Sequence, residues 1–515
     1  MRTHSPLAVL LTLFAAAASA DDWPQWRGPN RDGKSAETGL LKTWPQGGPP
    51  LAWTADNAGI GYGSPSVADG KVFVMGNGRG EEWAVCLEEK TGKTLWACAS
   101  GRIRSNGGGY PGPRCTPSFA NGKVYFIGLA GRIVCCDANK GTPIWYRQMV
   151  AEFGGKEPTW GYSESPLVDG DRVICTPGMQ NTVVALDAKT GKSVWEAKAG
   201  DPASYSSVIK AVYENTPQYV AFTERGLIGI RATDGTVLWR YDMPSNGQAN
   251  CCTPVAVGKT VFAASGFGRG GGCAWIRTDD TGAFAPKELY STNKTQCQHG
   301  GYVVVNRHLY GCGDPGVLVC LDYTTGKPSA ARRTGRFSIA YADGMLYMRH
   351  ETGKMELWEA SPTKPVSRGS FEQPYRSKFK AWAHPVIANG RLYLRDQTQL
   401  LCYNIQLEEK KEPAGKGPVA KEPASKEPAG KEPADKEPKA KEPAGNEVPT
   451  KEPPGEGPAP TESTGKEPAV RQPTSKGPDN KGPAAKEPAG KEPAAKEPVA
   501  KGPVTAASKS VAPAP

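Results

Sequence analysis

The chain repeats itself from about residue 64 to residue 405, and this repeat limits its fold more than any other feature. In each copy a Pro precedes an Asp-Gly or Asn-Gly turn and a short apolar strand, as in Thr116–Tyr125. Six copies are clear and two are weaker, around residues 206–222 and 299–310. The eight copies recur about every 48 residues, which is the spacing of propeller blades.

A second motif follows most copies, and Ala185–Trp195 is its fullest form, with Asp187 and Thr190-Gly191-Lys192 inside it. Apolar residues alternate on both sides of the Gly, which supplies the positive φ of a tight turn between two strands. Long helical periodicity is absent from the repeat region. We therefore predict an all-β, eight-bladed β-propeller of four-stranded antiparallel blades over residues 21–407.

A propeller needs its ring closed, because open strand edges invite aggregation. The last copy, residues 383–405, ends without an outer strand that carries a Trp. Residues 50–54, Pro-Leu-Ala-Trp-Thr, look like an outer strand without a blade. We predict that they complete the eighth blade and pin the two ends of the ring together.

The first twenty residues are typical of a cleaved signal peptide. Arg2 precedes an apolar run from Leu7 to Ala18, and Ala18-Ser19-Ala20 offers a small-x-small cleavage site. The run is shorter than the 18 or so apolar residues of a membrane span. We expect a protein that is secreted or periplasmic, without a transmembrane segment.

Residues 408–515 repeat Lys-Glu-Pro-Ala and contain no aromatic residue and no Cys, but 22 of the 47 prolines. Regularly spaced Pro prevents a helix, and without apolar side chains nothing offsets the entropy of ordering. We expect a disordered tail. It is either a tether that contacts other envelope material or an inert solubilising spacer.

The charge pattern restricts the partners. The net charge is +11, but the basic residues of the repeat region are scattered rather than gathered on one predicted face. This pattern argues against a nucleic-acid partner. We expect a monomer that binds a small molecule, a polysaccharide or a protein.

Alignment of the inner strands brings one short segment per blade to the mouth of the central channel. A concave site with aromatic walls and a few polar groups is the default ligand site of such a fold. The alternative is that Arg114 and Glu164 are structural and satisfy turn backbones or each other, and the sequence leaves both hypotheses open. The candidate ligand-binding residues are Arg114, Trp160, Tyr162, Glu164, His299, Trp382 and His384.

The Ala-x-Asp-x-x-Thr-Gly-Lys-x-x-Trp motif at 185–195 resembles the tryptophan-docking motif of PQQ-like β-propeller repeat proteins. Residues 22–30, Asp-Trp-Pro-Gln-Trp-Arg-Gly-Pro-Asn, and residues 160–166 are similar to an exported, uncharacterised branch of that family. The family includes quinoprotein alcohol dehydrogenases and non-catalytic exported propellers. The resemblance covers about residues 22–405 and concerns the scaffold rather than the chemistry.

Two functions follow from the resemblance. The favoured one is a non-catalytic scaffold that binds a ligand or a protein and needs no cofactor. The alternative is a PQQ-dependent alcohol or polymer dehydrogenase with calcium, which would use Arg114 and, as its catalytic carboxylate, Glu164. The cofactor-ligand motifs cannot be matched, and the five His residues have no metal-binding spacing, so we predict no metal site of the zinc type.

The thirteen cysteines suggest disulfides in an exported protein. Cys86, Cys135, Cys320 and Cys402, however, occupy the position of Ala185, where a small buried residue is expected. Because Cys135 is one of these docking residues, the Cys135-Cys136 pair is not expected to bond. The resemblance, in which quinoprotein alcohol dehydrogenases carry a vicinal disulfide, makes Cys251-Cys252 the candidate bridge.

Overall fold

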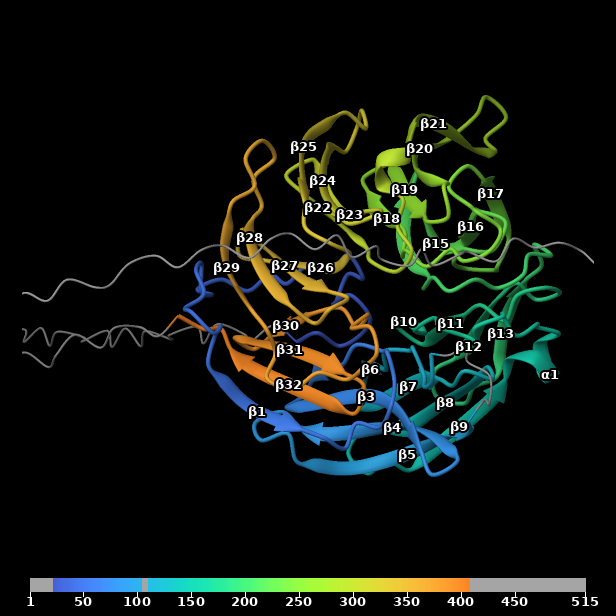
Figure 1. The fold of residues 1–515 in the computed structure, drawn as a ribbon. Helices are drawn as coiled ribbons and strands as arrows, with labels where there is room; N and C mark the ends of the chain where they lie inside the picture. The colour runs from blue at the N-terminus through green and yellow to red at the C-terminus, as the bar shows by residue number, and fades with distance from the viewer. Residues whose placement is uncertain (1–21, 104–109, 408–515) are drawn as a thin grey trace, which may run out of the picture. The chain divides into compact units, whose positions relative to one another are not determined.

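The computed structural model describes residues 22–103 and 110–407. The expected signal peptide, residues 1–20, and the expected tail, residues 408–515, lie outside this part of the chain. The described residues form eight sheets of four antiparallel strands each, arranged as the blades of a propeller (Figure 1). In seven of these sheets the strands follow one another in sequence order. The all-β, eight-bladed fold predicted from the repeat is confirmed.

The blades follow the chain. The strands of blades 1 to 4 are β2 (Ser66–Ala68), β3 (Lys71–Gly78), β4 (Glu81–Glu88), β5 (Thr94–Arg102), β6 (Ser118–Ala120), β7 (Lys123–Ile127), β8 (Arg132–Asp137), β9 (Pro143–Gln148), β10 (Leu167–Asp169), β11 (Arg172–Cys175), β12 (Val183–Asp187), β13 (Ser193–Ala197), β14 (Ile209–Tyr213), β15 (Thr216–Phe222), β16 (Leu227–Arg231) and β17 (Val237–Tyr241).

The strands of blades 5 to 8 are β18 (Val255–Val257), β19 (Thr260–Ser265), β20 (Gly270–Thr278), β21 (Phe284–Thr292), β22 (Tyr302–Val305), β23 (His308–Gly313), β24 (Val317–Asp322), β25 (Pro328–Arg333), β26 (Phe337–Ala342), β27 (Met345–His350), β28 (Met355–Glu359), β29 (Ser367–Phe371), β30 (Val386–Ala388), β31 (Arg391–Asp396), β32 (Gln399–Asn404) and the N-terminal β1 (Leu51–Ala55).

The ring closes between its two ends. Strand β1 pairs antiparallel with β32, so the N-terminal strand supplies the outer edge of the last blade. Trp53 of β1 is buried, and its indole N–H donates to the carbonyl of Glu89 in blade 1 at 2.9 Å. The closure predicted from the missing outer strand is confirmed.

Four docking Trp residues join their own blade to the next one, because their indole N–H groups donate to backbone carbonyls there: Trp53, Trp96, Trp145 and Trp195. Trp145 lies opposite Cys135 on the neighbouring strand, and its ring covers Gly191 of blade 3. A Cβ on Gly191 would lie 2.7 Å from that ring, and the φ of Gly191 is +71°, so this turn requires Gly. Cys86, Cys320 and Cys402 occupy the same position in their strands, which confirms that these cysteines are buried docking residues.

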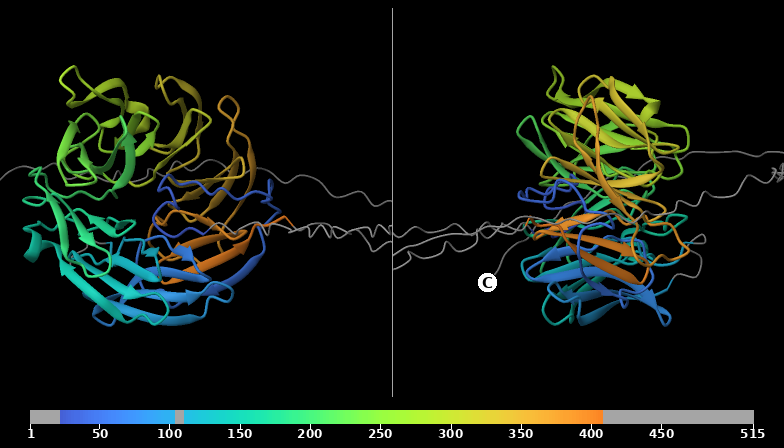
Figure 2. Two further views of the ribbon diagram at one scale, coloured as in Figure 1. Left: turned by 180° about the vertical axis from the view of Figure 1, so that it is seen from behind. Right: turned by 60° about the vertical axis from the view of Figure 1, so that its left-hand side comes forward.

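The segment before β1 crosses the ring, which the sequence did not predict. In the view from behind, this blue segment reaches toward the middle of the blades (Figure 2). It forms contacts with seven blades, through the pairs Trp23–Val67, Pro24–Phe119, Arg31–Ser165, Trp26–Thr253, Arg27–Tyr302, Gly33–Tyr341 and Arg27–His384. The motif at residues 22–30 therefore forms a plug in the central channel.

Helices are minor elements of residues 22–103 and 110–407. They comprise α1 (Met149–Phe153) and the 3-10 turn η1 (Asn293–Thr295). Neither of them, nor any other helix within these residues, has the length and apolarity to cross a membrane.

Candidate functional site

The loops that precede the inner strands converge on one cavity at the centre of the ring. Its volume is about 350 Å³, which lies in the range of small-molecule sites. Fifteen of its eighteen lining residues lie on these loops, Phe267 and Glu351 lie on other loops, and Trp26 lies in the N-terminal segment. The lining residues are Trp26, Tyr62, Tyr110, Arg114, Trp160, Ser163, Ser165, Tyr205, Ser207, Ala249, Cys251, Thr253, Phe267, Gln298, His299, Glu351, Trp382 and His384.

Aromatic side chains dominate the walls. The Trp382 ring lies 4.7 Å from the Tyr110 ring and 5.1 Å from the Tyr62 ring, measured between centroids. Trp160 and Tyr205 form a second pair at 5.5 Å. Aromatic rings offer large apolar faces at little cost in conformational entropy, so they suit the capture of a ligand with an apolar face.

The plug supplies one wall of the cavity. Trp26 donates its indole N–H to the Thr253 hydroxyl at 2.7 Å and packs on the His384 ring at a centroid distance of 4.6 Å. Arg27 is buried beside it, with Nη1 3.4 Å from Nδ1 of His384 and Nη2 donating to the carbonyl of Tyr302. Burial and the Arg27 charge keep the pKa of His384 well below its usual value, so His384 is neutral at pH 7.

A carboxylate orients His299. Its Nδ1 lies 3.4 Å from Oε1 of Glu351, which also accepts the indole N–H of Trp382 at 2.9 Å. Lys380 approaches the other oxygen of Glu351 at 3.3 Å. Nε2 of His299 is buried and has no hydrogen-bond partner among the described residues.

The electrostatics of this pair fix its protonation state. Burial lowers the pKa of His299 to about 4 against the attraction of Glu351, and the Arg336 and Lys380 charges lower it further. Burial by itself would raise the pKa of Glu351, but His299, Trp382 and Lys380 together hold it below its usual value. At pH 7 the carboxylate is therefore ionised and the imidazole neutral, with its proton on Nδ1 and an acceptor lone pair on Nε2.

Arg114 lies in the cavity wall as predicted, but its bonds are to the scaffold. Its guanidinium donates to the carbonyls of Trp160 at 2.9 Å and Tyr110 at 3.0 Å, and lies 5.9 Å from the centre of the Tyr62 ring. Burial lowers the pKa of Arg114 below its usual value, yet the group stays charged at pH 7. Among the described residues of the cavity lining, Arg114 is the cation.

Two predicted site residues lie elsewhere. Tyr162 is buried between blades 2 and 3: its backbone N–H donates to the carbonyl of Leu129 and its hydroxyl to the carbonyl of Pro177 at 2.8 Å. Glu164 is buried beside Arg31, and its Oε1 accepts the backbone N–H of Thr176. Neither lines the cavity, so their placement at the channel mouth was wrong. The side chain before a blade's inner strand can turn into the blade as easily as toward the channel.

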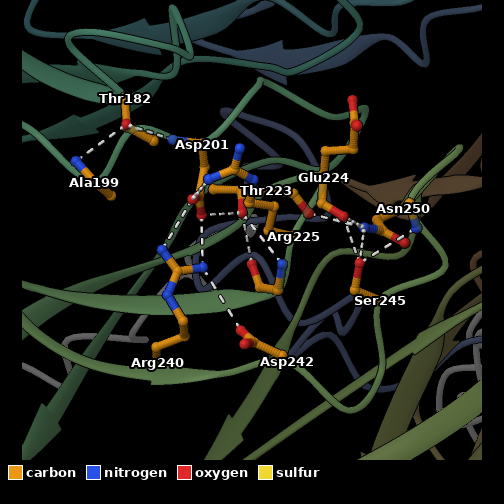
Figure 3. Close-up of polar contacts among 12 residues, drawn as sticks. Thr182, Ala199, Asp201, Thr223, Glu224, Arg225, Arg240, Asp242, Ser245 and Asn250 are labelled. Atoms are coloured by element: carbon orange, nitrogen blue, oxygen red, sulfur yellow. Dashed lines mark hydrogen bonds and ion pairs between the residues drawn. The ribbon is translucent and has the colours of Figure 1, made fainter.

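A buried ion pair holds one wall (Figure 3). Asp201 is fully buried and receives both Nη atoms of Arg240, at 2.8 and 2.9 Å, and the Thr223 hydroxyl at 2.7 Å. The carbonyl of Thr223 in turn accepts the amide of Asn250 at 2.8 Å. Asn250 directly precedes Cys251 of the cavity lining, so this network fixes the loop before blade 5.

The adjacent cysteines face different surroundings. Cys251 lines the cavity, whereas the Cys252 thiol is directed to the carbonyl of Gly300 at 3.6 Å and to Cys297. All thirteen cysteines lie within the described residues and are free thiols there, including Cys135 and Cys136. The structure thus contains no Cys251–Cys252 bridge. Burial raises the pKa of Cys251 to about 12, so its thiol is un-ionised at pH 7 and a poor nucleophile.

Sequence reasoning found Arg114, Trp160, His299, Trp382 and His384, because each lies just before an inner strand. It missed cavity residues that come from other segments. Trp26 belongs to the plug, and Glu351 and Phe267 lie on loops between the second and third strands of their blades. The sequence signal for Trp26 was the motif at residues 22–30, which has no place in the repeat.

The cavity does not fit PQQ with calcium. Calcium takes six to eight oxygen ligands, but Glu351 is the carboxylate of the lining, and it is engaged by three neighbours. Glu164, the proposed catalytic carboxylate, lies outside the cavity. Within the described residues, no group of three or more His, Cys, Asp or Glu side chains is placed to hold a metal ion.

The fold and the cavity define an eight-bladed propeller with a plugged channel and a ligand-sized site on one face. The family model described as "Outer membrane protein assembly factor BamB" matches residues 80–331. This match, the docking motif and the relatives below make the chain similar to the PQQ-like β-propeller repeat family.

Curated relatives of this chain differ in activity. The chain is 23% identical to tetrathionate hydrolase of Acidithiobacillus ferrooxidans, over 74% of this chain and 81% of that one. It is 27% identical to the dehydrogenase subunit of a quinone alcohol dehydrogenase of Gluconacetobacter polyoxogenes, over 42% of this chain and 34% of that one. The chain thus spans about a third of the dehydrogenase subunit that it matches.

Among solved structures, the quinohemoprotein alcohol dehydrogenase of Comamonas testosteroni superposes with a TM-score of 0.54 at 12% identity. The superposition covers 77% of this chain and 82% of that one. At this identity the likeness shows the fold alone.

Proposed function

We propose that the protein is a non-catalytic binding propeller that captures a small organic ligand in the cavity at the centre of its ring. One observation carries the proposal: seven aromatic side chains enclose a cavity of about 350 Å³ in which the charged groups are held by the scaffold. Such a cavity provides apolar contact and orientation, which are the needs of binding.

The polar groups of the cavity support binding over catalysis. Cys251 is un-ionised, and a His299 with a pKa of about 4 is a weak base at pH 7. Glu351 is committed to three neighbours and accepts no further proton near neutral pH. A dehydrogenase with PQQ and calcium is the alternative, and the poor fit of the cavity to that pair weighs against it.

The proposal includes export. The segment 1–20 has the pattern of a cleaved signal peptide, and the matching family model describes an outer membrane assembly factor. We infer that the propeller works in the cell envelope or outside the cell, either as a free protein or held by its Lys-Glu-Pro-Ala tail.

Tryptophan fluorescence of the full chain tests the proposal, because Trp26, Trp160 and Trp382 line the cavity. The probes are cellobiose, indole, p-nitrophenol, and PQQ with calcium chloride. We expect at least one organic probe to change the emission saturably in the wild type and weakly in Trp382→Ala. No saturable change with any probe would overturn the proposal. Dye-linked alcohol oxidation after loading with PQQ and calcium would instead establish the dehydrogenase.

A further inference from the structure

We propose that the ligand is a neutral polyhydroxylated ring, the chemistry of a carbohydrate unit, and that Nε2 of His299 accepts a hydrogen bond from one of its hydroxyl groups. This inference rests on the proposed function, since it names the ligand class of the same cavity.

The unused hydrogen-bonding capacity of the cavity is both accepting and donating. Nε2 of His299 is a buried acceptor without a partner among the described residues. The Ser207 hydroxyl accepts the N–H of Ser165 at 3.0 Å, and the Thr253 hydroxyl accepts the indole N–H of Trp26 at 2.7 Å. Each of these two hydroxyls keeps one hydrogen to donate, because within the described residues neither donates to a protein group.

A sugar hydroxyl matches this inventory, because it donates one hydrogen and accepts up to two. Its hydrogen can go to Nε2 of His299, and its lone pairs can accept from Ser207 or Thr253. The C–H faces of a pyranose ring are apolar and pack on aromatic faces such as those of Trp382 and Trp160. A purely aromatic ligand would offer no donor to Nε2 and would gain no hydrogen bond there.

The charge of the cavity selects a neutral ligand. Arg114 is the cation of the lining and Glu351 its carboxylate, while His299 and His384 are neutral at pH 7. These formal charges cancel. A polycarboxylate or a phosphate ester would need several cations to compensate its desolvation, and the described residues of the lining offer one.

The Glu351 carboxylate makes His299 a permanent acceptor. An ionised oxygen next to Nδ1 favours the proton on that nitrogen, which leaves the lone pair of the buried Nε2 unshared among the described residues. Trp382 both packs in the wall and donates to Glu351, so the aromatic platform and the acceptor are fixed to each other. His299 would thereby select a ligand hydroxyl at one place and orientation.

Calorimetric titration of the full chain with cellobiose, maltose, lactose and N,N′-diacetylchitobiose tests the inference. We expect saturable one-site binding of at least one disaccharide, weakened about tenfold by His299→Phe, which removes one buried hydrogen bond. His299→Gln provides a second variant if His299→Phe does not fold. His308→Phe is the matched control, because His308 lies outside the cavity on β23 and should leave the affinity unchanged.

The outcomes separate the two proposals. If indole or p-nitrophenol binds in a Trp382-dependent way and no disaccharide does, the carbohydrate inference is overturned and the binding function stands. If no probe binds, both are overturned. Equal affinity of the wild type and both His299 variants for a disaccharide would overturn the role of His299.

A retention experiment on insoluble polysaccharides distinguishes a polysaccharide ligand from a free sugar. Retention of the protein on cellulose or chitin, reversed by the matching disaccharide, would support recognition of a chain end. Disaccharide binding without such retention would support a free sugar as the ligand.

Discussion

Nδ1 of His299 lies 3.4 Å from Oε1 of Glu351, across the boundary between blades 6 and 7. The two residues are 52 positions apart in the chain, and each reaches the cavity from a different kind of loop. Their contact sets the tautomer of the imidazole and leaves Nε2 as an acceptor. Glu351 is thus a positioning residue for the proposed ligand contact.

The tautomer of His299 can be measured directly. We expect the side-chain ¹⁵N shifts of His299 to show the proton on Nδ1 in the wild type and in Glu351→Gln, whose amide oxygen can still accept it. Glu351→Leu removes the acceptor and should give a mixture of tautomers with weaker disaccharide binding. An unchanged tautomer in Glu351→Leu would contradict the positioning role.

Ligand binding should also fail at low pH. Burial lowers the pKa of His299 to about 4, and the residue faces Glu351, Lys380, Arg336 and, from the loop before the last blade, His384. Because its protonated form has no acceptor on Nε2, affinity should be flat from about pH 8 to 5.5 and fall as the pH approaches 4. Calorimetry with far-UV circular dichroism at each pH measures this, since the fold must persist for the loss to count.

Buried Glu164 should cost stability as the pH rises. Burial raises its pKa from 4.5 to about 7, against the Thr176 hydrogen bonds and the Arg31 charge. The folded state therefore holds this proton more tightly than the unfolded chain. As the pH rises from about 4.5 to 7, the unfolded chain loses the proton first, and the free energy of unfolding falls. Relative to the wild type, Glu164→Gln should gain about 2–3 kcal/mol between pH 4.5 and 8. Urea unfolding at both pH values checks this, and a constant difference would contradict it.

Closure of the ring should depend on Trp53. Its side chain is 9% exposed and bridges the last blade to Glu89 of blade 1. Trp53→Ala should lower the free energy of unfolding by about 3–5 kcal/mol. Leu51→Ala on the same strand is the control, since Leu51 is 43% exposed and should change it by less than about 0.5 kcal/mol. Similar losses in both variants would argue against the closure.

The ion pair of Asp201 and Arg240 should stabilise the wall of the cavity. Asp201→Asn removes the charge from a fully buried site and leaves a partly exposed Arg240, so we expect a loss of about 2–3 kcal/mol. Asp242→Asn is the matched control, because Asp242 is largely exposed and lies 3.6 Å from the same Arg240. Thermal unfolding compares them, and equal shifts would contradict the assignment.

Counting the thiols tests whether the cysteines are reduced. With thirteen free thiols in the structure, we expect thirteen reactive groups under denaturing conditions, before and after reduction. If the number of reactive thiols instead rose from eleven to thirteen on reduction, the protein would contain one disulfide. Cys251→Ser and Cys252→Ser, assayed separately, would then decide whether it is the vicinal bridge suggested by the family resemblance.

The scaffold could be predicted residue by residue where it repeats. The Gly of the Thr-Gly-Lys turn, the Trp that covers it and the small residue opposite that Trp recur with fixed spacing, because each blade solves the same packing problem. The same spacing placed Arg114, Trp160, His299, Trp382 and His384 near the channel. It failed for Glu164 and Tyr162, because strand alternation alone does not fix the direction of loop side chains.

The sequence by itself determined the number of blades, their four-stranded form and the strand that closes the ring, because local turn chemistry and apolar alternation specify these features. Only the tertiary structure placed Trp26 against Thr253, which is 227 residues away, and Glu351 against His299. Such contacts belong to no repeat, since they form between segments that meet only when the ring has closed. Local sequence patterns therefore specify the scaffold, whereas the cavity depends on contacts between segments that are far apart in the sequence.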